Sequence, residues 1–277
     1  MGAANYLFLA CFASTCIAFA QDPREIVRKS VSVDNDYNKR AQDYTMSQKS
    51  VARVIDSDGL LKSTTSKIRD IFFINGDRYY RLIERDGKSL SVEEDKKERE
   101  KFEKRLAGRD RETETQRKKR LAEREIRRRK EREFLNEIPD AFSFLLLPSE
   151  MIDGRAVWVI DANPRLDYKA HSAEAKVFAK FRGRLWIDKA DYEWVKMEVE
   201  SIGTVSFGLF IARLAKGAHL TVEQTRLNDE VWLPKRISIR YDIRVAILKH
   251  QAGDMEEIMY NFKKFQADSR ILSVTEQ

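Results

Sequence analysis

The sequence predicts an α+β fold built on a strongly curved antiparallel β-sheet, an incomplete barrel. Residues 181–200 alternate polar and apolar side chains on both sides of a charged break at 189–191, which is the pattern of an antiparallel hairpin. A longer alternation runs over residues 231–248. A strand of that length would span about 60 Å at about 3.3 Å per residue, so we expect it to bend. Because predicted strands outnumber predicted helices and are joined by short turns, the sheet is expected to be antiparallel.

The chain from residue 21 onward begins with a predicted helix and continues as a meander of strands. Asp22 is a favourable N-cap and Pro23 suits the first helical position, so we expect a helix that runs to about Tyr37. Extended patterns follow, separated by dipeptides that favour tight turns. In order, these strands and turns are 43–55, Asp58-Gly59, 60–74, Asn75-Gly76, 78–84 and Asp86-Gly87.

Residues 91–138 differ from the rest because almost every position is charged and favours a helix. A capping-box pattern begins at Ser91, and Gly108 is expected to break the segment into helices over 92–107 and 112–137. The segment is therefore predicted to be a helical insertion within a single domain that covers residues 21–277.

The charge of this insertion is strongly basic. Residues 96–133 hold 18 Lys and Arg against 10 Asp and Glu, whereas the apolar side chains lie mainly at 134–138, before Pro139. We predict a charged helical hairpin that projects from the sheet and is tied down at its C-terminal end. A solvated hairpin is the simpler interpretation, and contact with an anionic membrane surface or an acidic envelope protein is the alternative. Nucleic acid is not an expected partner, because Glu residues are interleaved with the basic ones and aromatic residues are scarce.

Strand patterns resume after the insertion, with one helical exception. Residues 206–214 place Phe207, Phe210, Ile211 and Leu214 at the i, i+3, i+4, i+7 spacing of an amphipathic helix. The remaining predictions are strands over 142–147, 155–162, 217–227 and 255–267, a loop over 163–180, and a turn at Gly253-Asp254.

The first 20 residues match a secretory signal peptide. The segment from Leu7 to Ala20 is apolar and uncharged and ends in Ala-Phe-Ala, although residues 1–6 lack the usual Lys or Arg. Cleavage after Ala20 would place the protein in the periplasm without a cysteine. Cys11 and Cys16 do not lie in good lipidation motifs, so a lipid-anchored form is not expected.

Three later motifs, together with the N-terminal helix and the meander, suggest a family. They are GRLWID at 183–188 leading into VKME at 195–198, VWLP at 231–234, and YNFKKF at 260–265. With them the chain resembles the LolA/LolB-like outer-membrane lipoprotein-sorting proteins over most of residues 22–270, apart from the insertion. This resemblance implies an incomplete barrel with helices over its concave face. It also implies an apolar cavity that holds acyl chains in transit through the periplasm.

The candidate ligand-binding residues are the apolar faces of the predicted strands. Such faces are ordinary core in most β proteins, and we expect them to line a cavity here because few helices cover a curved sheet. The segment at 206–214 is core by default and a hydrophobic lid by hypothesis. The cavity-lining candidates are Leu185, Ile187, Val195, Met197, Val199, Ile237, Ile239, Tyr241, Ile243, Val245 and Ile247, and the lid candidates are Phe207, Phe210, Ile211 and Leu214.

No arrangement of residues in the sequence points to catalysis. His171, His219 and His250 lie in three different predicted elements, and no metal-ligand spacing, nucleophile motif or phosphate loop is present. We therefore expect no cofactor and no metal. The predicted function is a periplasmic, non-enzymatic carrier of lipid or lipoprotein acyl chains in outer-membrane lipoprotein sorting. The alternative is an envelope protein-interaction module that acts through the basic insertion.

Overall fold

The computed structural model describes residues 21–40, 43–56, 58–74, 77–207, 212–245 and 249–264. The predicted signal peptide and the Asn75-Gly76 turn lie outside these ranges. No helix of the described residues is long and apolar enough to cross a membrane.

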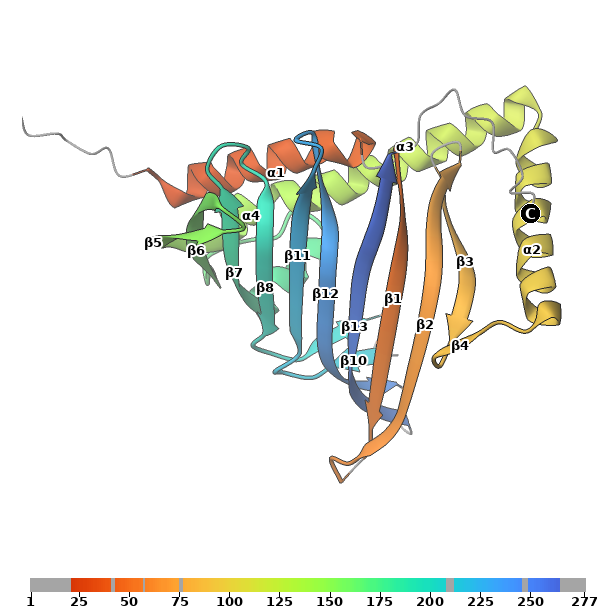
Figure 1. The fold of residues 1–277 in the computed structure, drawn as a ribbon. Coiled ribbons are helices and arrows are strands. Elements are labelled where there is room, and N and C mark those ends of the chain that lie inside the picture. The colour runs from red at the N-terminus through yellow and green to blue at the C-terminus, as the bar shows by residue number, and fades with distance from the viewer. Residues whose placement is uncertain are drawn as a thin grey trace, which may run out of the picture.

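A single antiparallel sheet organises the described chain (Figure 1). Its strands follow the order β4-β3-β2-β1-β13-β12-β11-β8-β7-β6-β5, and the short β10 pairs with β12 and with the short β9. The strands are β1 (Tyr44–Ile55), β2 (Leu61–Ile74), β3 (Asp77–Arg85), β4 (Lys88–Ser89), β5 (Phe142–Ile152), β6 (Arg155–Pro164), β7 (Phe181–Asp188), β8 (Trp194–Ser201), β9 (Val205–Phe207), β10 (Ala212–Leu214), β11 (His219–Leu227), β12 (Val231–Val245) and β13 (Lys249–Lys264).

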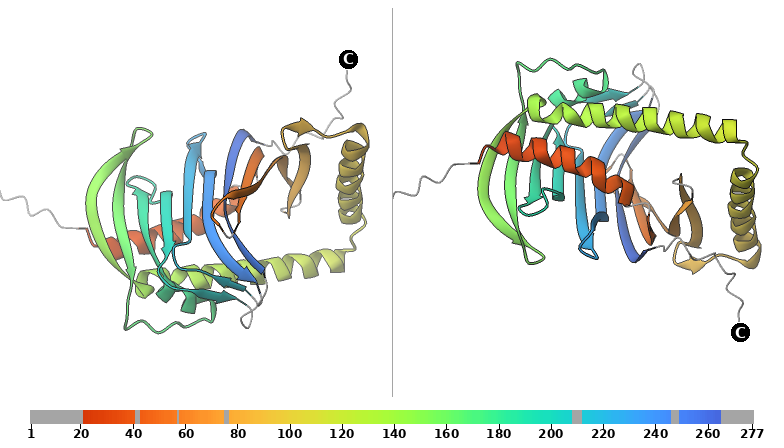
Figure 2. Two further views of the ribbon diagram at one scale, coloured as in Figure 1. Left: turned by 90° about the horizontal axis from the view of Figure 1, so that it is seen from below. Right: turned by 90° about the horizontal axis from the view of Figure 1, so that it is seen from above.

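The sheet is curved but not closed, since β4 and β5 end it on either side. The helices are α1 (Pro23–Arg40), α2 (Val92–Asp110), α3 (Glu114–Asn136), α4 (Ile138–Ala141) and the 3₁₀ helix η2 (Glu174–Lys180). Figure 2 shows α1 and α3 running side by side across the strands, with α2 beyond the β3 end of the sheet. The predicted fold class, an α+β incomplete barrel with helices on its concave face, is confirmed.

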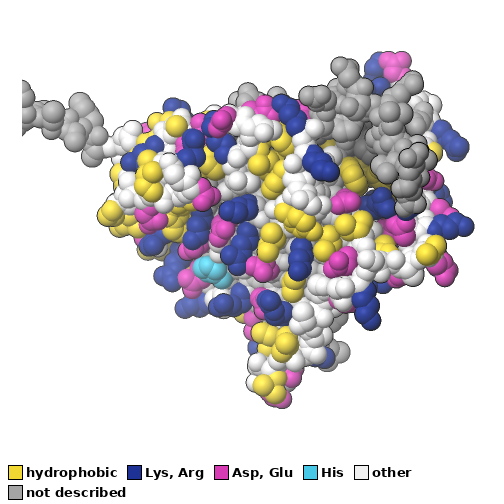
Figure 3. Space-filling model, in the orientation of Figure 1, with side chains coloured by type: hydrophobic (Ala, Val, Ile, Leu, Met, Phe, Trp, Pro, Cys, Tyr) yellow, Lys and Arg dark blue, Asp and Glu magenta, His cyan; other side chains and the backbone are white. Residues whose placement is uncertain are grey.

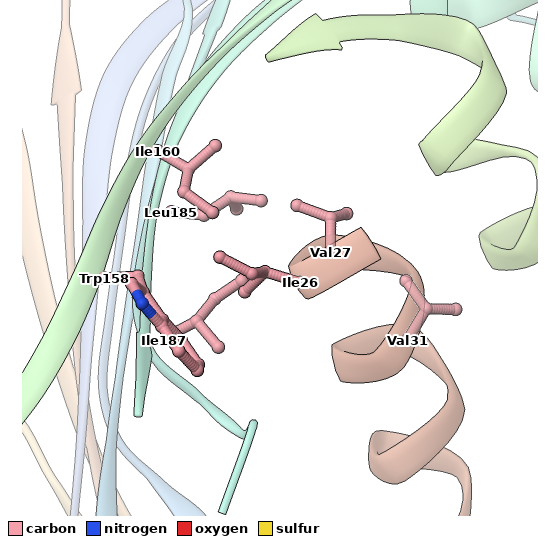
Figure 4. Close-up of a cluster of buried hydrophobic side chains, with 7 residues drawn as sticks. All are labelled: Ile26, Val27, Val31, Trp158, Ile160, Leu185 and Ile187. Atoms are coloured by element: carbon pink, nitrogen blue, oxygen red, sulfur yellow. The ribbon is translucent and has the colours of Figure 1, made fainter. Parts of the chain in front are cut away.

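Helix α1 is held against the sheet by one apolar stripe. Ile26, Val27 and Val31 are buried, at the spacing that places side chains on one face of a helix. They pack on Trp158 and Ile160 of β6, together with two residues of β7 (Figure 4). We call the face of the sheet that carries α1 the inner face and the opposite one the outer face.

The insertion forms the two predicted helices, and both helices contact the sheet. In α2, the ring of Phe102 lies 5.7 Å from that of Phe72 and 6.4 Å from that of Tyr79. The break between the helices comes a few residues later than Gly108, where Thr113 forms a capping box with Gln116 and starts α3. The C-terminal end of α3 is tied down as expected.

The helix expected at 206–214 is wrong for the described residues, which are strands. β10 pairs with β12 and places Leu214 opposite Ile243. A short apolar run fits helix and strand spacing almost equally, and here pairing with a long neighbouring strand decided the outcome. Phe210 and Ile211 lie outside the described residues, as does the side chain of Phe207.

The turn expected at Gly253-Asp254 is also wrong, because Gly253 lies inside β13. A Cβ atom at Gly253 would lie 2.1 Å from the carbonyl oxygen of Arg53 in β1. The glycine is therefore needed for close approach of two strands, and not for a turn.

Candidate ligand-binding cavity

An apolar cavity of about 450 Å³ lies on the inner face between the sheet and the end of the insertion. Its floor comes from β7, β8, β11 and β12, and its roof from α3, α4 and η2. The floor residues are Leu185, Met197, Val199, Leu220, Ile239 and Tyr241, and the roof residues are Phe134, Leu135, Ile138, Val177 and Phe178. The cavity falls within the range of about 300–1,000 Å³ that is typical of small-molecule sites.

The roof is held together by aromatic contacts. The rings of Phe134 and Phe178 stack with centroids 4.6 Å apart, and Phe142 of β5 meets Phe178 edge-on at 5.5 Å. Stacked and edge-on aromatic pairs of this kind are each worth about 0.5–1.5 kcal/mol beyond the area that they bury. The insertion and η2 therefore form one packed cover over the strands.

Glu137, which directly follows α3, fixes the loop that leads to η2. Its carboxylate accepts hydrogen bonds from the hydroxyl of Tyr168, from the hydroxyl of Ser172 at 2.7 Å, and from the backbone N–H of His171 at 2.9 Å. Burial alone would raise the pKa of Glu137, but these donors outweigh it and lower the pKa to about 2. The carboxylate is therefore ionised at neutral pH and anchors the roof.

Two charged side chains at the cavity border face away from its apolar interior. Arg182 of β7 is exposed and donates to Glu200 of β8 at 2.7 Å. Arg240 of β12 is exposed as well and lies opposite His219 of β11 in the register of the sheet. The interior is thus lined by apolar side chains and backbone, which suits a ligand without polar groups at that depth.

Several residues proposed from the sequence lie in this cavity. Leu185, Met197, Val199, Ile239 and Tyr241 line its floor, and the lid candidate Leu214 lines it from β10. Whether they bind a ligand remains a prediction. Ile243 pairs with Leu214 in β10 and does not line the cavity. Ile247 and the side chain of Val245 lie outside the described part of the chain.

Two other candidates lie elsewhere for clear physical reasons. Ile187 is fully buried beneath α1 and belongs to the core. Val195 is the extra residue of a β-bulge, since Ile187 pairs with Trp194 and Trp186 pairs with Lys196. The bulge shifts the alternation, so Val195 packs with Trp186 on the outer face.

The roof residues were not among the sequence candidates. The sequence identifies the apolar cluster at 134–138 only as an anchor, and it predicts a loop over 163–180. Ala175 and Phe178 are nevertheless buried in η2. The available signal is the three-residue spacing of Ala175 and Phe178, which fits a 3₁₀ helix but occurs once in a segment too short to distinguish a 3₁₀ turn from a loop.

A second cavity of about 240 Å³ lies beside the first on the inner face, where β1, β2 and β3 meet β11, β12 and β13. Ile237, another sequence candidate, lines this one. Its lining is mixed, because Gln48, Arg78 and Glu257 join apolar residues such as Met46. No group of His, Cys, Asp or Glu that could hold a metal ion occurs among the residues that the structure describes.

Comparisons with known proteins give structural similarity only. No family model matches the sequence, and no curated protein matches it. An outer membrane lipoprotein-sorting protein domain from Vibrio parahaemolyticus is similar with a TM-score of 0.30 and 10% identity over 88% of this chain and 95% of that chain. A LolA superfamily protein from Nitrosomonas europaea has a TM-score of 0.26 and 12% identity over 86% and 93%.

A third similar structure is the MucA/MucB complex of Pseudomonas aeruginosa, with a TM-score of 0.22 and 9% identity over 86% of this chain and 100% of that chain. At these values the similarity assigns no activity, ligand or partner to this chain. The structures that it resembles do include outer membrane lipoprotein-sorting and LolA superfamily proteins, the family that its sequence resembles.

Proposed function

We propose that this protein binds an acyl chain of a lipid or lipoprotein in the apolar cavity and releases it without covalent chemistry. The single observation that carries the proposal is a cavity of about 450 Å³ lined by apolar side chains between the sheet and the roof. Each methylene group removed from water there would contribute about 0.8 kcal/mol. A chain of a dozen methylenes would thus offset the cost of ordering the ligand.

The proposed setting is the periplasm. During outer-membrane lipoprotein sorting, an acyl chain that crosses this aqueous compartment has to be kept out of water by a binding protein. The export pattern at residues 1–20 supports this setting. The roof supports a carrier role, because α3 and η2 cover the cavity with side-chain contacts that can separate without breaking the sheet.

Filling the cavity tests the proposal directly. Ala162 is buried in β6 and lines the cavity, so Ala162→Leu reduces the space for a ligand. Ala156→Leu is the matched control, because Ala156 is exposed in the same strand and lines neither cavity. Native mass spectrometry after incubation with a long-chain fatty acid should show an adduct on the wild type and the control and a much weaker one on Ala162→Leu.

The result that contradicts the proposal is equally clear. Equal uptake by both variants would mean that the acyl chain does not bind in this cavity. No uptake by the folded wild type would remove the acyl-binding function altogether. Circular dichroism of each variant establishes that the comparison is made between folded proteins.

A second candidate function rests on the basic side chains of α3. Arg117, Lys119 and Arg127 are exposed and make no ion pair among the described residues. They could contact an anionic membrane surface or an acidic envelope protein. Deleting the insertion would not test this, because the deletion removes the cavity roof. The charge reversals Lys119→Glu and Arg127→Glu keep the roof, and they should abolish sedimentation with anionic vesicles if this function holds.

A further inference from the structure

The two inner-face cavities are close enough for one ligand to occupy both. Leu220 and Ile239 line the apolar cavity, whereas Val222 and Ile237 line the second cavity two residues further along the same strands. Two residues of a strand span about 7 Å. Met197 of the apolar cavity lies directly opposite Val222 of the second. We call the second cavity the polar compartment.

A side-chain amide lines the polar compartment and can hydrogen-bond to a ligand there. Gln48 lines it and is only 8% exposed, yet its side chain makes no hydrogen bond among the described residues. The amide can both donate and accept hydrogen bonds, and it lines an open compartment, so a ligand there can take the place of solvent as its partner.

The compartment also carries a carboxylate without a protein partner. Glu257 of β13 lies opposite Ile237 on the inner face, and it makes no ion pair among the described residues. The other carboxylate of the compartment, Glu193, is already engaged in an interaction within the chain. Glu257 is therefore the group available to a positively charged or hydrogen-bond-donating ligand.

A cationic side chain lies on the other side of the same compartment. Arg78 of β3 lines it, with its guanidinium 5.2 Å from the ring centroid of Phe73. The compartment therefore presents an anion-binding side, at Arg78, and a cation-binding side, at Glu257.

We propose that the polar compartment binds the head of an ammonium-bearing, zwitterionic phospholipid whose acyl chain occupies the apolar cavity. The ammonium group would contact Glu257 and the carbonyl of Gln48, and the phosphate would lie near Arg78. This inference rests on the proposed acyl binding and adds selectivity for the head group. A purely anionic phospholipid leaves Glu257 without a partner, so it binds less well.

The test is competition between two lipids that differ only in the head. Delipidated protein is mixed with equal amounts of phosphatidylethanolamine and phosphatidylglycerol of identical acyl chains in detergent, and adducts are counted by native mass spectrometry. We expect about tenfold preference for phosphatidylethanolamine, the effect of one charge-assisted hydrogen bond. Glu257→Gln should reduce the preference to near equality while total lipid uptake persists.

The chain offers a matched control in the adjacent residue. Glu256 lies on the outer face, where it pairs with Arg236, so Glu256→Gln changes the same charge in the same strand away from the compartment. This variant should keep the wild-type preference. Loss of the preference in Glu256→Gln as well would overturn the assignment to Glu257.

The remaining outcomes separate this inference from the proposed function. Equal uptake of both lipids by the wild type would overturn head-group selection and leave acyl binding intact. No uptake of either lipid would overturn the proposed function itself. Displacement of bound lipid by phosphoethanolamine, which has no acyl chain, would mean that the ligand is the free head compound, whereas no displacement is expected.

Discussion

Phe134 at the end of α3 stacks on Phe178 of η2, with ring centroids 4.6 Å apart. The two residues come from a highly charged insertion and from a segment that looks like a loop in the sequence. Their contact closes the roof over the apolar cavity, so the insertion is part of the candidate binding site. Figure 3 shows the outer side of the sheet, where charged side chains are scattered widely among apolar ones.

The first prediction concerns this roof contact. Phe178→Ala should lower the free energy of unfolding by about 3–5 kcal/mol, as expected for removing a buried aromatic ring, and it should weaken acyl binding. Urea unfolding and fatty-acid uptake measure the two effects. Phe102→Ala is the control, because Phe102 anchors the other end of the insertion and lines neither cavity. It should destabilise the protein and leave binding unchanged; equal loss of binding in both variants would contradict a specific role for the roof.

The second prediction concerns the pH dependence of the roof. The pKa of Glu137 is lowered from 4.5 to about 2 in the folded protein, so the carboxylate stabilises the fold fully above about pH 4.5. This contribution should be lost as the pH falls from 4.5 toward 2. Glu137→Gln should lower the free energy of unfolding by about 1–3 kcal/mol at pH 7. The stability of this variant should also fall less than that of the wild type between pH 4.5 and pH 2. Thermal melts between pH 2 and 7 provide the measurement. If the melting temperatures of the wild type and the variant fall in parallel with pH, Glu137 does not cause the pH dependence.

The third prediction concerns an ion pair between Arg155 of β6 and the buried Asp188 at the end of β7. Arg155 donates to both oxygens of Asp188 at 2.6 and 2.8 Å, and Asp188 is 1% exposed. Asp188→Asn should lower the free energy of unfolding by about 1–3 kcal/mol, because it removes a buried carboxylate partner of the guanidinium and leaves Asp191, at 3.0 Å, as the remaining one. Asp161→Asn removes the more exposed partner of Arg184 and should cost less than about 1 kcal/mol. Chemical denaturation measures the loss of unfolding free energy in each variant. Similar losses in the two variants would contradict the prediction.

The fourth prediction concerns the glycine inside β13. Gly253→Ala would place a Cβ atom 2.1 Å from the carbonyl oxygen of Arg53, so β1 and β13 would have to separate. We expect the free energy of unfolding to fall by more than about 2 kcal/mol, which is a larger effect than that of an ordinary surface substitution. Gly108→Ala is the control, since Gly108 lies in α2 with open space around it, and it should stabilise the helix by about 0.5–1 kcal/mol. A destabilised Gly108→Ala variant, or a neutral Gly253→Ala variant, would show that the packing argument fails.

Most of the strands could be predicted from the sequence alone, because polar and apolar side chains alternate along them. The pairing of β7 with β8 and the long β12 follow from period-2 patterns, which depend only on the geometry of a strand. The helix α1 follows from Asp22, Pro23 and an apolar stripe. The two helices of the insertion follow from composition and capping, because these are local properties.

Only the tertiary structure decided where the cavity lies and which residues line it. The bulge at Val195 moved one predicted residue to the outer face, and contact with α1 placed Ile187 in the core. The roof at Phe134 and Phe178 joins segments 44 residues apart in sequence, and the polar compartment joins Gln48 to Glu257 across more than 200. Periodicity reports which side of a strand a residue occupies. It carries no information on which distant element covers that side, because this depends on the pairing order of strands and on long-range packing.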